Sequence, residues 1–162
     1  STGEEKSAED GEAYSYQYLE RISVAYDPIS TYGYDPRWLT PSYEKISGGG
    51  AVSLTAQKEK YPYKSRTVDL VLTNDSDTSI MYGRAFQLEV EIDGTWYKVP
   101  PVYDPLYFTL EGIILSPHST ATLEIPIGLY RCHPGKHRII KNAHEMTEGR
   151  GEFVAAAEFN LI

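Results

Sequence analysis

The stretch FQLEVEIDGTWYKVPP, residues 86–101, alternates apolar and polar side chains and then turns at an Asp-Gly pair. Apolar residues occupy every second position from Phe86 to Ile92, with a glutamine and two glutamates between them. This alternation is typical of a β-strand with one dry and one wet face. An Asp-Gly pair between two such runs is a strong signal for a two-residue hairpin turn. The stretch therefore predicts an antiparallel hairpin that packs by one face on a second sheet.

The turn also predicts which residues face each other across the hairpin. With two turn residues the apolar sides of the strands match, and Glu91 lies opposite Trp96 while Glu89 lies opposite Lys98. Both glutamates and Trp96 then lie on the solvent side, although a one-residue bulge would reverse this. The prolines at 100–101 cannot donate to a ladder, so the second strand ends there or lies at an edge.

The rest of the chain from residue 51 has the same β texture. Short runs rich in Val, Ile, Thr and aromatic residues alternate with turn signals such as YPYKS, NDSDTS, SPHS and HPGK. The predicted strands are 51–56, 67–74, 85–92, 95–99, 110–115, 120–127, 137–141 and 153–162. Strands at this spacing, with one dry and one wet face, predict an all-β protein built as an antiparallel β-sandwich.

Length, charge and cysteine content exclude several classes of protein. A chain of 162 residues has room for one domain plus an extension. The net charge of −8 argues against nucleic-acid binding, which needs clustered Lys and Arg. No apolar run approaches the length of about 20 residues that a membrane helix needs. A single cysteine, Cys132, excludes an internal disulfide, which leaves the compartment open.

Composition divides the chain into three parts. Residues 1–13 are polar and acidic, and we expect a disordered tether there. Residues 14–50 hold half of the fourteen tyrosines, and Gly and Pro punctuate them, so we expect an aromatic extension that packs on the domain. Within it the alternation from Tyr14 to Tyr26 predicts a strand, with a short helix as the rival interpretation. Residues 51–162 are then the sandwich.

Several segments together resemble a known family. FQLEVEIDGTWYKVP, HPGKHRIIK and AAAEFNLI, with YPYKSRTVDLVLTNDSD and GIILSPHSTATLEIPI, resemble in order and spacing a bacterial immunoglobulin-like domain of Gram-positive surface lipoproteins and membrane-anchored sensors. The resemblance covers about residues 51–162. It implies an immunoglobulin-like sandwich outside the cytoplasmic membrane, tethered through a lipidated cysteine upstream of residue 1, with no catalytic residues. His137 departs from the family, which has an aromatic residue two positions after the Pro-Gly turn.

Candidate catalytic and metal sites are weak. Cys132, His133 and His137 suggest a soft metal site, but Pro134-Gly135 forms a turn rather than the helix that would align the two imidazoles. Asp27, Asp35 and Asp104 recur in Tyr-Asp-Pro turns, where calcium binding is an alternative to a capping role. The Gly-flanked serine elbow of hydrolases is absent. We predict no enzyme, no cofactor and no metal, with a hydrolase of unrecognised site as a further alternative.

Aromatic side chains are the better candidates for binding, because Tyr and Trp supply large contact areas at low entropic cost. The predicted binding residues are Tyr32, Tyr34, Trp38, Trp96, Tyr103 and Tyr107. The competing interpretation is that these aromatics cover an open sheet of the same chain.

With the resemblance, these residues predict a non-catalytic extracytoplasmic interaction or ligand-sensing module of a bacterial surface protein, and the alternative is a glycan-binding module. The partner is an unknown protein or glycan, not nucleic acid, and a membrane is reached only through an upstream anchor. The oligomeric state is left open.

Overall fold

The computed structural model describes residues 33–47, 50–147 and 151–162, and it divides the chain between Asp35 and Pro36. The β-fold is formed by the second unit, Pro36–Ile162. Its strands are β1 (Val52–Ala56), β2 (Lys60–Tyr61), β3 (Val68–Asn74), β4 (Ile80–Tyr82), β5 (Gln87–Ile92), β6 (Thr95–Lys98), β7 (Ile113–Leu115), β8 (Ser119–Ile125), β9 (Gly135–Glu145) and β10 (Glu152–Leu161). Two short 3-10 helices, η2 (Pro36–Trp38) and η3 (Ile127–Leu129), complete it. None of the helices in the described ranges is long and apolar enough to cross a membrane.

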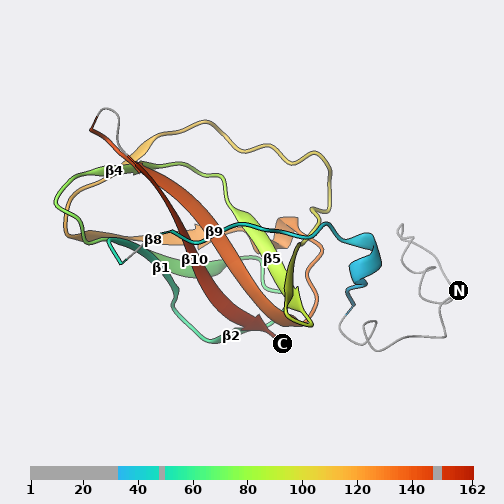
Figure 1. Cartoon of the computed structure of the whole chain (residues 1–162). Coiled ribbons are helices and arrows are strands. Elements are labelled where there is room, and N and C mark those ends of the chain that lie inside the picture. Colours follow the sequence, from blue (N-terminus) through green and yellow to red (C-terminus); the bar gives the residue numbers. More distant parts are fainter. Residues whose placement is uncertain (1–32, 48–49, 148–150) are drawn as a thin grey trace, which may run out of the picture. The chain divides into compact units, whose positions relative to one another are not determined.

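The strands form two sheets (Figure 1). The smaller sheet has three strands in the order β1-β3-β8, all antiparallel. The larger sheet has seven strands and is organised around β9, which pairs with β10 on one side. On its other side β9 is shared, because the β5-β6 hairpin pairs with its first half and β4, followed by β7, pairs with its last residues. The long strand β9 therefore carries two separate hairpin-like extensions along one edge.

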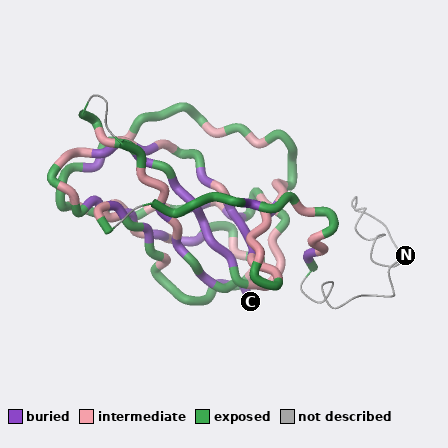
Figure 2. Tube along the Cα trace, in the orientation of Figure 1, coloured by how far each residue is buried: buried purple, intermediate pink, exposed green. Residues whose placement is uncertain are grey.

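The core lies between the two sheets and follows from the alternation in the sequence. In β3 every second side chain is buried, and Val68, Leu70 and Leu72 are at most 1% exposed. Ile139 on β9 is fully buried as well. The buried positions lie along the strands in Figure 2. The all-β sandwich predicted from the sequence is confirmed.

The opening hairpin adopts the predicted register. Glu91 lies opposite Trp96 and Glu89 opposite Lys98, with no bulge between them. Asp93 and Gly94 both have positive φ, 50° and 84°, as a two-residue turn of the primed type requires. A local signal of two residues thus decides which face of the sheet every side chain of the hairpin occupies.

The turn predicts how a substitution of Gly94 changes the stability of the domain. A Cβ added there meets no atom within 4 Å, so the cost of Gly94→Ala is backbone strain alone, which we expect to lower the free energy of unfolding by about 1 kcal/mol. Gly151→Ala is the matched control, since that glycine is equally open but has no positive φ. Urea denaturation measures both. Equal shifts in the two variants would contradict the assignment of the turn.

Two strands were not predicted from the sequence. β2 has only two residues, of which Tyr61 lies in a segment that the sequence assigned to a turn, and it pairs with β10 in parallel. β4 has three residues directly after a polar loop. Neither is long enough to show a period of two, so pairing with a long neighbour, rather than local sequence, makes them strands.

The predicted tether, 1–13, and the first part of the predicted extension, 14–32, lie outside the described residues. Of the extension the structure describes 33–47 and residue 50. Residues 40–47, called the strap below, contain no regular strand but hydrogen-bond to the larger sheet. The role predicted for residues 14–50 as a whole stays a prediction.

Candidate functional site

The strap crosses the face of the larger sheet that points away from the smaller sheet, here called the outer face (Figure 1). At one end the Lys98 amide donates to the Thr40 carbonyl at 2.9 Å, and the Ser42 amide donates to the Trp96 carbonyl at 2.8 Å. At the other end the Ser47 amide donates to the Val154 carbonyl at 2.8 Å. The strap therefore spans the sheet from β6 to β10.

Beneath the strap lies a buried carboxylate. Glu89 is fully buried, and its oxygens accept hydrogen bonds from Ser42 Oγ, from Gln87 Nε2 and from Arg138 Nε, the last at 2.7 Å. Arg138 lies directly opposite Glu89 on β9 and is itself 7% exposed. Glu89 lies opposite Lys98 as predicted, but the expectation that it lies on a wet face was wrong, because the strap covers this part of the outer face.

Trp96 lies on the outer face, as predicted, but is only partly available. The Arg138 guanidinium lies over its ring, with Cζ 4.3 Å from the centroid, and Lys136 Nζ is 5.8 Å from the centroid. Lys136 also pairs with Glu91 at 3.3 Å and with Glu158 at 3.4 Å. The indole thus takes part in cation–π contacts with Arg138 and Lys136, and these contacts hold the two cationic side chains of β9 in place.

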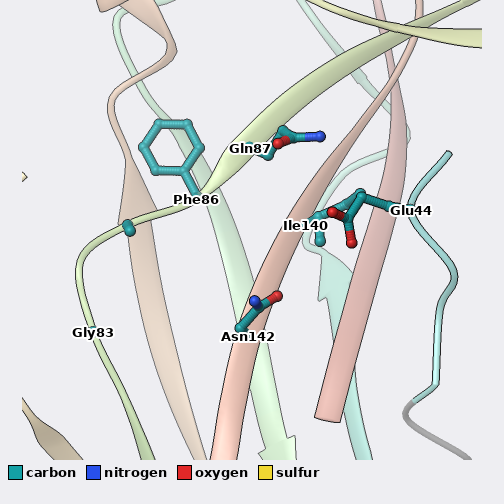
Figure 3. Close-up of a pocket in the computed structure, with 7 residues that line it drawn as sticks. Glu44, Gly83, Phe86, Gln87, Ile140 and Asn142 are labelled. Atoms are coloured by element: carbon teal, nitrogen blue, oxygen red, sulfur yellow. The ribbon is translucent and has the colours of Figure 1, made fainter. Parts of the chain in front are cut away.

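A polar hollow of about 370 Å³ lies on the outer face beside the strap (Figure 3). Glu44 from the strap, Gln87 from β5 and Asn142 from β9 line it together with Ile140, whereas the Phe86 side chain points away from these polar groups. Glu44 offers a carboxylate, and Gln87 and Asn142 offer amides that can donate and accept hydrogen bonds. These side chains suit the binding of a small polar group.

A second hollow, of about 430 Å³, lies between η2, the edge of the hairpin and the loop that follows β6. We call it the proline groove, and among its lining residues are Trp38, Leu39, Pro100, Pro101, Pro105 and Leu106. Trp38 is 82% exposed although it lines this groove. The loop contains a cis peptide bond between Asp104 and Pro105.

The loop after β6 carries two of the predicted binding residues, and both are open to solvent. Tyr103 is 79% exposed and Tyr107 is 84% exposed. The loop runs between the proline groove and a third hollow. Phe86 and Phe108 line both hollows. Their rings pack at a centroid distance of 5.3 Å, which anchors the loop on the sandwich.

The third hollow, of about 610 Å³, is called the edge groove. It is lined by successive residues of β8, Thr122 to Ile125, and by Tyr82, Tyr107 and Lys141. Lys141 is 3% exposed, and its ammonium donates to the carbonyls of Gly83 and Ala85, the latter at 2.9 Å. Burial lowers the pKa of Lys141 to about 8, and the nearby Arg84 adds to this shift.

The predicted binding residues are therefore not all in one place. Trp38, Tyr103 and Tyr107 are exposed around the proline groove and its bordering loop, whereas Trp96 lies on the outer face. Tyr34 is 3% exposed, so its ring offers almost no surface. Tyr32 lies outside the described residues.

The Cys132–His137 segment has two histidines with separate contacts, of which His133 is half-buried and His137 is buried. His133 stacks on Tyr63 at 6.4 Å, and His137 stacks on Phe159 at 6.1 Å between centroids. His137 is fully buried and its Nδ1 lies 2.8 Å from the Gly135 carbonyl oxygen; burial lowers its pKa to about 4. Burial raises the pKa of the Cys132 thiol to about 12. Where the structure describes the chain, no three His, Cys, Asp or Glu side chains are grouped to hold a metal.

Two charged clusters could not be recognised from the sequence. His118 has a φ of 53° and lies between Asp75 and Asp77, at 3.1 and 2.8 Å, on the exposed loops beside β3 and β8. Hydrogen bonds from Asp77 and then Asp75 raise the pKa of His118. Arg84 pairs with Glu111 at the rim of the edge groove. Both pairs join loops that are distant in sequence, so only the three-dimensional pairing of β4 with β7 and β3 with β8 reveals them.

Comparison with protein families agrees with the architecture. A family model described as a bacterial Ig-like domain matches residues 49–160. Among solved structures, the chain is similar to the ASH / PapD-like domain of human CEP192 (PapD-like domain 7), with 14% sequence identity, coverage of 76% of this chain and 92% of that chain, and a TM-score of 0.35. No curated protein matches the chain. The matched residues run from just before β1 into the end of β10.

Proposed function

This chain belongs to the family of bacterial Ig-like domains, and we propose on that premise that it is a non-catalytic interaction module that works outside the cytoplasmic membrane. Ig-like domains typically display binding surfaces on a rigid sandwich and carry no catalytic centre. In our proposal an anchor upstream of residue 1 holds the module at the surface of a bacterium. A partner then binds the loops and edges that the sandwich presents.

The exposed aromatics Trp38, at the proline groove, and Tyr103, on the loop that borders it, support this proposal most directly. Trp38 is 82% and Tyr103 is 79% exposed, although both are large side chains whose burial would stabilise the fold. Exposed aromatics around an apolar hollow are typical of interaction sites. In contrast, neither a serine nor a cysteine lines any of the three hollows described above.

We take a protein segment to be the partner. Most of the residues that line the groove are apolar or aromatic, among them three prolines and three leucines, and they offer apolar contacts to a peptide. Its volume of about 430 Å³ accepts a few side chains rather than a folded domain. A glycan is the second candidate, because Lys98 and Asp104 also line the groove and could hydrogen-bond sugar hydroxyls beside the Trp38 ring.

Selection of a displayed peptide library against the full chain tests the proposal. We expect selected peptides to lose at least tenfold in affinity, about 1.4 kcal/mol, when Trp38→Ala or Tyr103→Ala removes an aromatic anchor. Isothermal calorimetry gives the affinities. Both side chains are exposed, so the midpoint of thermal unfolding should stay unchanged.

Tyr43→Ala is the matched control, since Tyr43 is 84% exposed on the strap but neither lines the proline groove nor belongs to the loop after β6 that borders it, as Tyr103 does. A glycan array probed with the same variants addresses the second candidate. Loss of glycan binding in Trp38→Ala, without any selected peptide, would replace the protein partner by a sugar. If Tyr43→Ala weakened binding as much as Trp38→Ala, the proline groove would not be the binding surface.

A further inference from the structure

We propose that the edge groove receives an extended peptide with an acidic side chain, which pairs with the free edge of β8 and places its carboxylate at Lys141. This second surface borders the proline groove, with which it shares Phe86 and Phe108, but it does not depend on the function proposed for that groove. Three features carry the inference: an open strand edge, a hollow that follows this edge, and a buried cation inside the hollow.

The edge of β8 is open in the part of the chain that the structure describes. β8 pairs with β3 on one side and with no described strand on the other. Ala121 and Leu123 point into the sandwich, opposite Leu72 and Leu70, yet they are only half-buried, whereas Leu70 and Leu72 are at most 1% exposed. The interior of the sandwich is therefore accessible along this edge. An added strand would satisfy the backbone groups of β8 and cover Leu123.

The edge groove follows this strand. It is lined by consecutive residues of β8, Thr122 to Ile125, with Tyr107 and Tyr82 on the opposite wall. The volume of about 610 Å³ lies within the range of about 300–1,000 Å³ that is usual for ligand sites. A hollow beside a free edge can receive every second side chain of an added strand, because these side chains point to one face.

Lys141 makes the groove selective for an anion. Its ammonium has three donors, and two acceptors are present, the carbonyls of Gly83 and Ala85. Among the described residues no carboxylate lies within ion-pair distance of Lys141. A buried cation without a counter-charge is costly, and a carboxylate from outside would supply the missing partner. With its pKa lowered to about 8 by burial, Lys141 still carries its charge at neutral pH.

The other charged groups at the edge groove do not remove its preference for an anion. Arg84 lines the groove and adds positive charge, although it is paired with Glu111 at the rim. Glu124 also lines the groove, but it is exposed and belongs to the face of β8 that points away from the sandwich. An acidic side chain that enters between the sheets therefore meets Lys141, whereas Glu124 stays in solvent. This charge complementarity is why the occupant is an acidic peptide rather than a basic one.

Calorimetry on the full chain tests the proposal with a register series of capped synthetic peptides. Each peptide alternates Val and Thr and carries one Glu at a different central position, and each has a matched peptide with Gln instead. We expect at least one Glu peptide to bind at least tenfold more tightly than its Gln counterpart. In Lys141→Met this preference should disappear. Amide resonances of β8 should shift on binding, as strand addition requires.

Lys141→Met leaves two backbone carbonyls without their donor and can misfold for that reason. A second variant therefore tests the same proposal with Lys141 in place. Leu123→Glu places a carboxylate of the chain itself in the edge groove, and it should likewise abolish the preference for the Glu peptides. If no Glu peptide bound more tightly than its Gln counterpart, the proposal would be overturned. The same holds if acetate displaced the peptides fully without any shift of β8 resonances, since the site would then take small carboxylates without strand addition.

Discussion

Arg138→Met is expected to lower the free energy of unfolding by about 3–5 kcal/mol, the cost of leaving a buried carboxylate without its cation. Glu89 is fully buried, and Arg138 Nε at 2.7 Å is the cation that pairs with it. Methionine keeps much of the apolar volume of the arginine stem but offers no donor. Glu89 would then have to remain charged with only Ser42 and Gln87 as donors, or take up a proton. Chemical denaturation at neutral pH measures the loss.

Lys136→Met is the matched control for this prediction. Lys136 lies two residues earlier on β9, points to the same face, and pairs with Glu91 and Glu158. These pairs are largely exposed and screened by solvent, so we expect a loss of stability much smaller than that of Arg138→Met. The double variant Glu89→Met with Arg138→Met should recover most of the stability, because no unpaired charge stays buried. Similar losses in Lys136→Met and Arg138→Met would show that the strap does not exclude water from Glu89.

The hairpin could be predicted from the sequence, whereas the environment of its glutamates could not. Register depends on the two turn residues Asp93 and Gly94, whose preference for positive φ is local. Burial of Glu89 depends on Ser42 and the strap, 47 residues earlier in the chain. A charged side chain at an alternating position of a strand normally indicates a face that is exposed to solvent. Here the face is buried because a segment distant in sequence covers it.

Strand β9 shows why the edge groove was not predicted. HRIIK contains two adjacent isoleucines, which point to opposite faces of the strand. The alternation therefore does not decide which face points into the sandwich. In the structure His137, Ile139 and Lys141 share the inward face, which is the more polar of the two possible assignments. Ile140 on the outer face is buried as well, so each face of this strand carries a buried isoleucine. Lys141 consequently lies where a sequence pattern would not place a lysine.

The exposure of the aromatic residues could not be predicted from the sequence either. The tripeptide Tyr-Asp-Pro occurs at 34–36 and again at 103–105, yet Tyr34 is 3% exposed and Tyr103 is 79% exposed. A local motif specifies a turn in both places, but the exposure of its tyrosine depends on what packs against it. Sequence could therefore nominate aromatic residues for binding, and the structure was needed to separate the exposed ones from the buried one.

His137 is expected to make the domain sensitive to acid. Its pKa is lowered to about 4 in the folded chain by burial, against about 6.5 for an unfolded histidine. Between these values the unfolded state binds more protons than the folded state, so stability falls as the pH falls from about 6.5 to 4. A shift of this size corresponds to a loss of about 3 kcal/mol at the acid end. Denaturation curves measured across this pH range give the slope.

His137→Phe should remove this part of the pH dependence, because phenylalanine can keep the stacking on Phe159 and has no proton to bind. Its absolute stability can change through the lost contact with the Gly135 carbonyl, so the slope with pH, rather than the stability at one pH, is the diagnostic quantity. His144→Gln serves as the control, since His144 is an exposed residue of the same strand. Protonation of carboxylates contributes equally to the parent chain and both variants and cancels in the comparison. A slope in His137→Phe equal to that of the parent would mean that the imidazole becomes charged without unfolding, and that the core around Phe159 admits water.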